Sequence, residues 1–255
     1  LSLPVHDAGV KLSIGEEQRV INVQGRLERA PSETVMAFLH SKAMQKLTAN
    51  VLNGWQSPQG FADARINVHV PLNRIEQLNV NVDAQLSDVD LLLTAQDLAI
   101  NNIHGDLLFD FKKGFSAKNL TGELWGKPIK ASINGKNGDK LQFTSRINHQ
   151  SLQDWLKLPE FNFLNGEMAV KGTLNWGKTA SAIHISSNLQ GMALELPEPL
   201  GKTHDQRLNV EFNLPLTGVK RELKISSDEG LNLQFLMGEQ GIEAGLISLG
   251  LTDNA

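Results

Sequence analysis

Apolar and polar residues alternate along most of this chain, and that alternation constrains the fold more than any other feature. The clearest copy lies in residues 100–133, where single residues separate Leu107, Phe109 and Phe111. A side-chain period of two places these three on one face of a pleated strand. Similar stretches, bounded by turns that contain Gly, Pro or Asn, recur along the chain. The sequence therefore predicts a mostly β protein built from antiparallel hairpins.

Two stretches replace this alternation with helical spacing. Residues 32–47 carry apolar residues three and four apart after a candidate N-cap, Ser32, and predict an amphipathic helix. Its apolar face is modest and its only basic residues are Lys42 and Lys46. That composition favours packing across the end of a sheet over lying on a membrane surface. Residues 151–158 predict a second, short helix that Pro159 ends.

The two helices predict a duplicated architecture. In both places a strand precedes the helix, and a Gly-led strand and a pair of alternating strands follow it. We therefore expect one β unit over residues 1–147, with its helix near 32–47. We expect a second over residues 148–255, with its helix near 151–158.

Composition excludes several functional classes. The 255 residues suffice for one large β domain or two smaller units. The net charge is −4, and the only adjacent basic pairs are Lys112-Lys113 and Lys220-Arg221, so no nucleic-acid partner is predicted. Cysteine is absent, which removes disulfides, thiolate metal sites and Cys nucleophiles. The chain begins inside a strand-like stretch and ends just after an apolar run, so we expect a section of a longer protein.

One stretch, residues 172–179, fits the phosphate-binding pattern G-x-x-x-x-G-K-[ST]. That loop needs a buried strand before it and a helix that starts at the Lys. Here the alternation continues through the supposed loop, and the residues after it alternate again. The sequence therefore predicts a hairpin turn at Gly177-Lys178 and no nucleotide site.

Other catalytic and metal-binding patterns are also missing. The seven histidines form no H-x-H or H-x-x-x-H pair. Asp83, Asp88 and Asp90 lack the Gly and the terminal Glu of a calcium loop, and we interpret them as the solvated side of a strand and its turn. No G-x-S-x-G is present. We therefore predict no catalytic residue, no metal and no cofactor, and we do not expect an enzyme.

The apolar face itself is the remaining candidate for function. Its lining comprises Ile66, Val68, Val70, Val80, Val82, Leu107, Phe109, Phe111, Ile183, Ile185, Val210, Phe212, Leu214, Leu231, Leu233 and Phe235. One interpretation is the closed core of an ordinary sandwich or barrel, which composition alone favours. The other is a curled sheet whose inner face forms an open apolar groove. Strands of about six to eight residues span roughly 20 to 26 Å at ~3.3 Å per residue, close to the length of a fatty acyl chain.

A family resemblance favours the groove. Residues 189–202, LQGMALELPEPLGK, resemble a G-x-x-L-x-LP-x-PLGK stretch of YhdP-type proteins. Residues 21–27 (INVQGRL), 124–129 (LWGKPI) and 172–176 also resemble that family, as does the Asp-Trp-Leu segment at 154–156. The likeness covers most of the chain in order, and the LP-x-PLGK stretch is its most specific part.

This resemblance implies a fold and a function. YhdP-type proteins group with the AsmA and TamB relatives of Gram-negative bacteria and are similar to bridge-type lipid-transfer proteins. The implied fold is a long, curled antiparallel sheet that forms an open groove. The implied role is a periplasmic conduit for phospholipids between the inner and outer membranes, which supports the outer-membrane barrier.

The resemblance also implies the partners. They are phospholipid acyl chains and adjoining sections of the same chain, with an inner-membrane anchor outside these residues and no catalytic residues. The alternative is a β-sandwich binding, adhesion or structural module that has a closed core and transports no lipid.

Overall fold

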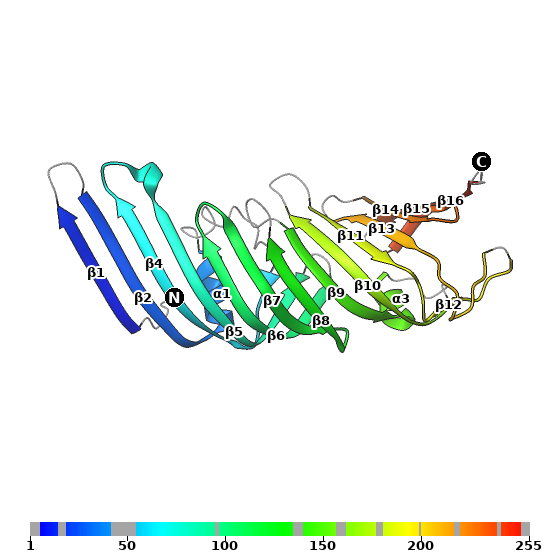
Figure 1. The fold of residues 1–255 in the computed structure, drawn as a ribbon, viewed down its shortest axis with the longest axis horizontal. Coiled ribbons are helices and arrows are strands. Elements are labelled where there is room, and N and C mark those ends of the chain that lie inside the picture. The colour runs from blue at the N-terminus through cyan, green and yellow to red at the C-terminus, as the bar shows by residue number, and fades with distance from the viewer. Residues whose placement is uncertain are drawn as a thin grey trace. The chain divides into compact units, whose positions relative to one another are not determined.

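A computed structural model of the chain consists of one long antiparallel sheet with two short helices (Figure 1). The structure describes residues 6–14, 19–41, 55–94, 97–134, 140–156, 162–176, 181–198, 200–216, 220–238 and 241–250. The prediction of a mostly β fold with a long antiparallel sheet and two short helices is confirmed.

The strands are long in the first half of the chain and shorter in the second. They are β1 (His6–Ile14), β2 (Arg19–Pro31), β3 (Trp55–Gln56), β4 (Phe61–Pro71), β5 (Asn79–Leu93), β6 (Leu98–Asp110), β7 (Gly114–Leu124), β8 (Lys127–Asn134), β9 (Lys140–Asn148), β10 (Leu164–Trp176), β11 (Ser181–Ser187), β12 (Met192–Leu194), β13 (Val210–Pro215), β14 (Arg221–Ser227), β15 (Leu231–Gly238) and β16 (Gly241–Leu249). The helices are α1 (Ser32–Leu39), the single turn η1 (Ile75–Gln77) and α3 (His149–Leu156).

The strand order follows the chain. It runs β1-β2-β4-β5-β6-β7-β8-β9-β10-β11-β13-β14-β15-β16, while β3 pairs with β5 and β12 pairs with β10. Nearly every strand therefore pairs with the strands before and after it in sequence. Among the described residues no ladder joins β1 to β16, so the hydrogen bonds do not close the sheet into a barrel.

The chain divides into two compact units. Unit 1 comprises residues 1–123 and 130–141, and unit 2 comprises residues 124–129 and 142–255. Each unit contains one of the two helices and its own cluster of buried apolar side chains.

A row of β-bulges crosses unit 1. The register shifts between Leu27 and Ala30 where β2 pairs with β4, and between Leu86 and Val89 where β5 pairs with β6. Arg29 and Asp88, within these shifts, have φ of 44° and 52°. A bulge bends its strand and strengthens the local twist. Figure 1 accordingly shows β5 and β6 bending at their lower ends, near α1.

Aspartates complete the hydrogen bonding of this bulge row. The Arg29 N–H donates to Asp63 Oδ1 at 3.0 Å, and the Asn102 N–H donates to Asp90 Oδ1 at 3.0 Å. Asp88 lies 3.2 Å from His104 Nε2. Asp83 and Asp88 are exposed, as interpreted from the sequence, and the half-buried Asp90 has a further role, because its carboxylate satisfies a backbone donor beside the bulge.

The bulges also correct the predicted strand boundaries. The alternation at Val80, Val82 and Leu86 changes phase before Val89, and from the sequence alone this change predicts a second strand that begins at Val89. The structure has one strand, β5, because the extra residue of the bulge restores the phase. Phe111 lies just beyond β6, in a turn where its N–H donates to the Val80 carbonyl at 2.9 Å.

Helix α1 packs on the sheet as predicted. Its Val35 contacts the buried cluster of Leu27, Ala30 and Ala64. Ser32, however, is the first helical residue rather than the N-cap. Its hydroxyl donates to the Gln59 carbonyl at 2.8 Å, which ties the helix to the loop before β4. Residues 42–47 of the predicted helix lie outside the described residues.

Helix α3 begins two residues earlier than predicted. The Ser151 N–H donates to Asn148 Oδ1 at 2.7 Å, which caps the first turn of the helix. The ring of Trp155 lies 5.8 Å from that of Trp125, which occupies the β7–β8 turn. Trp125 and Gly126 have φ of 52° and 71°, as a tight hairpin turn between right-twisted strands requires.

The PLGK stretch folds around a buried lysine. Lys202 is 8% exposed, and its Nζ donates to the carbonyls of Leu189 at 2.8 Å, Met192 at 2.5 Å and Thr203 at 2.9 Å. Burial lowers the pKa of Lys202 below its ordinary value. A Cβ on Gly201 would lie 2.2 Å from the Leu196 carbonyl oxygen, so the preceding position leaves no room for a side chain. One buried ammonium group thus holds the backbone carbonyls of Leu189, Met192 and Thr203 together beside β12, and we name this arrangement the structural clasp.

Gly172, the first residue of the phosphate-loop match, also has a structural role. It lies inside β10, and its missing side chain leaves room for the Phe143 ring, which a Cβ would approach to 2.1 Å. Residues 177–180, which contain the predicted turn, lie outside the described residues. Strand β10 continues through Gly172, as the sequence predicted, whereas a phosphate-binding loop would leave the strand there.

Candidate functional site

The candidate lining residues within the strands of unit 1 lie on one face of the sheet, while Phe111 lies in the turn beyond β6. Their backbone partners form cross-strand rows, in which each residue is directly opposite the next. The rows are Val10–Val23–Val68–Val80, Leu12–Ile21–Val70, Gly25–Ile66–Val82–Phe109 and Leu27–Ala64–Ala84–Leu107. Because directly opposite side chains share a face, the apolar surface is continuous from β1 to β6. Phe109 extends it further, with its ring 4.9 Å from that of Phe115 in β7.

Unit 2 repeats this arrangement. One row crosses six strands, and three shorter rows flank it. They are Gly172–Ile185–Phe212–Ile225–Leu233–Ile247, Leu174–Ile183–Leu214, Leu223–Phe235–Gly245 and Leu231–Leu249. The apolar face of unit 2 is therefore continuous from β10 to β16.

Burial separates the candidate lining residues into two groups. Val80, Val210, Leu214 and Phe235 are buried. The other twelve are half-buried: Ile66, Val68, Val70, Val82, Leu107, Phe109, Phe111, Ile183, Ile185, Phe212, Leu231 and Leu233. A sealed sandwich core of this size would bury most of them completely. Most of the face thus keeps contact with solvent.

In each unit the helix covers part of this face. Trp155 and Leu156 of α3 pack against the cluster of Leu214, Leu223, Phe235 and Met237, which explains the burial of Leu214 and Phe235. In unit 1, Val35 of α1 packs where the strands bend, beside Ala64 and Ile66. Each helix therefore converts one portion of an open apolar face into a small closed core.

Several residues of the face were missing from the predicted lining. On β1, Val10 is 72% exposed and Leu12 55% exposed, and on β16 Ile247 is 61% exposed. On β14, Leu223 and Ile225 complete the rows of unit 2. The alternation in these strands carried the signal, since it has the same period of two as the alternation of the predicted lining residues.

The opposite face of each unit is mostly polar, with single exposed leucines such as Leu108 and Leu246. His69 Nδ1 lies 2.7 Å from Asn22 Oδ1 in unit 1, and His184 Nδ1 lies 2.7 Å from Asn213 Oδ1 in unit 2. Because a carboxamide oxygen only accepts, Nδ1 carries the proton in both contacts. The histidines thus join neighbouring strands on the solvated side.

A charge cluster ties three strands together on unit 2. Glu167 of β10 forms ion pairs with Lys127 of β8 and with Arg146 of β9. Hydrogen bonds from the Lys127 ammonium and then from Arg146 hold the pKa of Glu167 below its ordinary value. The two ion pairs link β8, β9 and β10 through their side chains. Because both cations stabilise the ionised carboxylate, Glu167 is poorly suited to act as a general acid.

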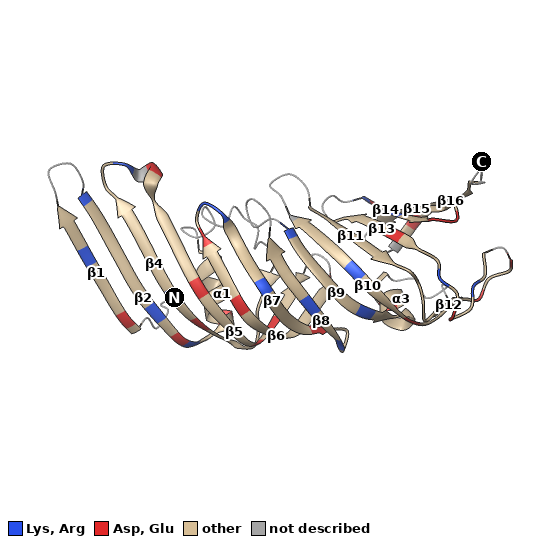
Figure 2. Ribbon diagram, in the orientation of Figure 1, with Lys and Arg blue, Asp and Glu red and all other residues tan. Residues whose placement is uncertain are grey.

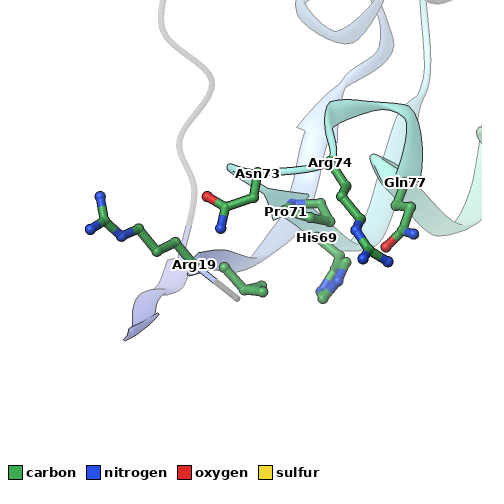
Figure 3. A pocket seen from close by; sticks show the side chains of 7 residues that line it. Arg19, His69, Pro71, Asn73, Arg74 and Gln77 are labelled. Atoms are coloured by element: carbon green, nitrogen blue, oxygen red, sulfur yellow. The ribbon is translucent and has the colours of Figure 1, made fainter. Parts of the chain in front are cut away.

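A shallow hollow lies at the end of β4 in unit 1 (Figure 3). It is lined by Arg19, Val20, His69, Pro71, Asn73, Arg74 and Gln77. In Figure 3 the guanidinium of Arg74 and the carboxamide of Gln77 lie together beyond the His69 ring, while the Arg19 guanidinium points away from them. The hollow therefore gathers nitrogen donors on a solvated edge of the sheet.

Neither a metal-binding cluster nor a membrane-spanning helix is found among the described residues. No group of three His, Asp or Glu side chains among them is arranged to hold a metal ion. Within the same residues, no helix has the length and apolar character needed to cross a bilayer.

Comparison with known proteins supports the family resemblance. A family model described as YhdP protein matches residues 5–254, nearly the whole chain. No curated protein and no solved structure matches the chain.

Proposed function

This chain belongs to the YhdP family, and from that premise we propose that it is a section of a periplasmic hydrophobic conduit. The conduit carries phospholipids between the inner and outer membranes of a Gram-negative bacterium and so maintains the outer-membrane barrier. Its anchor in the inner membrane lies outside these residues.

The observation that carries the proposal is the unbroken, half-exposed apolar face. In unit 2 a single row places Ile185, Phe212 and Ile225 side by side with further apolar residues across six strands. A protein surface of this extent is costly to leave in water unless something apolar covers it. Acyl chains fit that requirement, because an apolar chain slides along a face that has no polar interruption.

Transport along this face needs no tight binding. Each CH₂ that leaves water contributes about 0.8 kcal/mol, and the gain is similar at every position of a uniform apolar row. A lipid that moves along a row, from one strand to the next, exchanges equivalent contacts, so no position traps it. The bulge row of unit 1 supports a sheet that bends over the acyl chains, since bulges bend the strands at one level.

The outer strands support continuation into adjoining sections of the same protein. Val10 and Leu12 on β1 and Ile247 on β16 are exposed, and they extend the same apolar rows. An unpaired edge with a flat apolar face is a template for another strand. Adjoining strands would complete these ladders and prolong the conduit.

Site-specific photo-crosslinking in cells tests the proposal. A photoreactive residue at Phe109 should capture phospholipid, whereas the same residue at Leu108 should not. Leu108 is a matched control because it is the next residue on β6, is 47% exposed and points to the opposite face. Equal capture at both positions, or none at either, would refute the conduit. Mass spectrometry of lipid that co-purifies with the chain gives a second, independent measurement.

A closed core is the competing possibility, and the same position separates the two. If Phe109 lines a conduit, Phe109→Asp abolishes lipid capture and leaves the fold intact. If it belongs to a sealed core, the substitution unfolds the chain, because a buried carboxylate without a partner is very unfavourable.

A further inference from the structure

The strand ends of unit 1 that lie away from α1 carry a concentration of positive charge. The start of β2, the β4–β5 turn and the β6–β7 turn meet there, since the Leu72 N–H donates to the Arg19 carbonyl at 2.7 Å and the Phe111 N–H donates to the Val80 carbonyl at 2.9 Å. These segments present Arg19, Arg74, Lys112 and Lys113, which we name the cationic rim. Figure 2 shows the blue segments at the upper ends of these strands.

Three cations of this rim form no ion pair with another described residue. No carboxylate of the described residues lies within ion-pair distance of Arg74, Lys112 or Lys113. Asp110 is adjacent, but its Oδ1 accepts the backbone N–H groups of Lys112 and Lys113 at 2.9 and 3.0 Å, which shapes the turn. Among the described residues of these segments Glu76 is the other acid, so four cations stand against two carboxylates; Glu16 and Glu17, which precede Arg19 in the sequence, lie outside the described residues.

The hollow at the end of β4 gives part of this rim a defined geometry. The Arg74 guanidinium lies beside the Gln77 carboxamide (Figure 3), and its fork of N–H donors matches the oxygens of a phosphate. The Nδ1–H of His69 is already engaged by Asn22, so the donors to a ligand are those of Arg74 and Gln77.

The direction of the apolar face determines which part of a lipid reaches the rim. Helix α1 occupies the face where the strands bend, at Leu27, Ala30 and Ala64. Acyl chains on the free part of the face therefore have their polar ends toward the opposite strand ends, where the cationic rim lies. The headgroup and the cations meet at the same edge.

We propose that the cationic rim of unit 1 binds the phosphodiester headgroups of phospholipids whose acyl chains lie on the apolar face. This inference rests on the proposed function and adds a headgroup preference to it. Lipids that carry a phosphate are held by the cationic rim, whereas neutral diacylglycerols bind only through their acyl chains. The rim holds headgroups through surface electrostatics, so the preference weakens as salt concentration rises.

The test compares two lipids with identical acyl chains, phosphatidylglycerol and diacylglycerol. The chain is loaded with each in detergent, purified and analysed for retained lipid by mass spectrometry. The rim variant Arg74→Gln/Lys112→Gln/Lys113→Gln should lower phosphatidylglycerol retention at least about fivefold, because each cation near a lipid phosphate contributes on that order. Retention of diacylglycerol should not change.

A matched variant controls for net charge. Arg65→Gln/Lys118→Gln/Lys130→Gln removes the same number of positive charges from exposed mid-strand positions of unit 1. It should leave the retention of both lipids unchanged. Equal phosphatidylglycerol retention by the two triple variants would overturn the proposal while diacylglycerol retention still supported the conduit.

Two further outcomes would overturn the proposal in different ways. If the wild-type chain retains neither lipid, the conduit itself fails, and the rim proposal fails with it. Millimolar inorganic phosphate, monitored by NMR at the Gln77 side-chain amide, tests for a site that takes free phosphate. Suppose that phosphate shifts the Gln77 resonance and that the rim variant retains as much phosphatidylglycerol as the wild-type chain. The site would then bind free phosphate, and the lipid assignment would be overturned.

Discussion

Replacing Lys202 with methionine should destabilise unit 2 while leaving its apolar packing nearly unchanged. Methionine has a similar unbranched stem, so Lys202→Met creates little cavity. The variant loses the three hydrogen bonds from Nζ to the carbonyls of Leu189, Met192 and Thr203. It tests whether the PLGK stretch serves as a structural clasp.

The magnitude follows from the carbonyls left behind. The Leu189 carbonyl keeps a second hydrogen bond, from the Met192 N–H at 3.1 Å, so we count only the other two acceptors. An acceptor left without its donor costs about 1–3 kcal/mol, so two of them give a loss of about 2–6 kcal/mol. Burial lowers the pKa of Lys202, which means that the ammonium is desolvated in the fold. Methionine avoids that cost, so the lower half of the range is expected.

Equilibrium urea unfolding, followed by tryptophan fluorescence, measures this loss. Trp125 and Trp155 belong to unit 2 and report on its unfolding. Lys171→Met is the control, because Lys171 is exposed on β10 and its loss should change stability by no more than about 0.5 kcal/mol. A loss of less than about 1 kcal/mol for Lys202→Met would refute the clasp, because the buried hydrogen bonds would then contribute nothing beyond desolvation.

Three other substitutions probe different parts of the molecule. Phe109→Asp should abolish lipid retention and lower the unfolding free energy by no more than about 2 kcal/mol, the scale of its half-buried ring and its contact with Phe115; mass spectrometry and urea unfolding measure the two effects. Glu167→Gln should flatten the acid limb of the stability curve: because the folded-state pKa of Glu167 is lowered, its stabilisation is present above the unfolded value of 4.5 and disappears as pH falls through the folded value. Thermal unfolding at a series of pH values checks this, and an unchanged acid limb would contradict it. Gly172→Ala should cost about 1–3 kcal/mol because the new Cβ meets the Phe143 ring, and the double variant with Phe143→Leu should recover part of that loss in urea unfolding.

Alternation alone predicted the fold class and most strands, since a period of two survives in nearly every segment of the sheet. It failed where backbone geometry departs from the regular pleat. At Val89 the pattern predicts a new strand, whereas the structure has a bulge, which changes the phase of the pattern without ending the ladder. Ser32 looked like an N-cap, yet its hydroxyl bonds to a loop that is distant in sequence. Such contacts leave no periodic signal.

Which residues form the apolar face was easier to predict than how far solvent reaches each of them. The residues opposite one another on β11 and β13, such as Ile185 and Phe212, follow directly from the alternation. Which of them a helix covers does not, because the burial of Leu214 depends on where α3 packs. The three carbonyls around Lys202 were also beyond prediction, since a lysine in a turn is usually solvated.

The order of the strands has a consequence for how the protein acquires its structure. Almost every ladder joins two strands that follow one another in the chain, so each new hairpin needs only a short loop to close. The last completed strand is then the template for the next, and pairing can advance in one direction while the rest of the polypeptide is still being delivered. Each strand of such a sheet can pair with the preceding strand before the strands that follow it have been delivered.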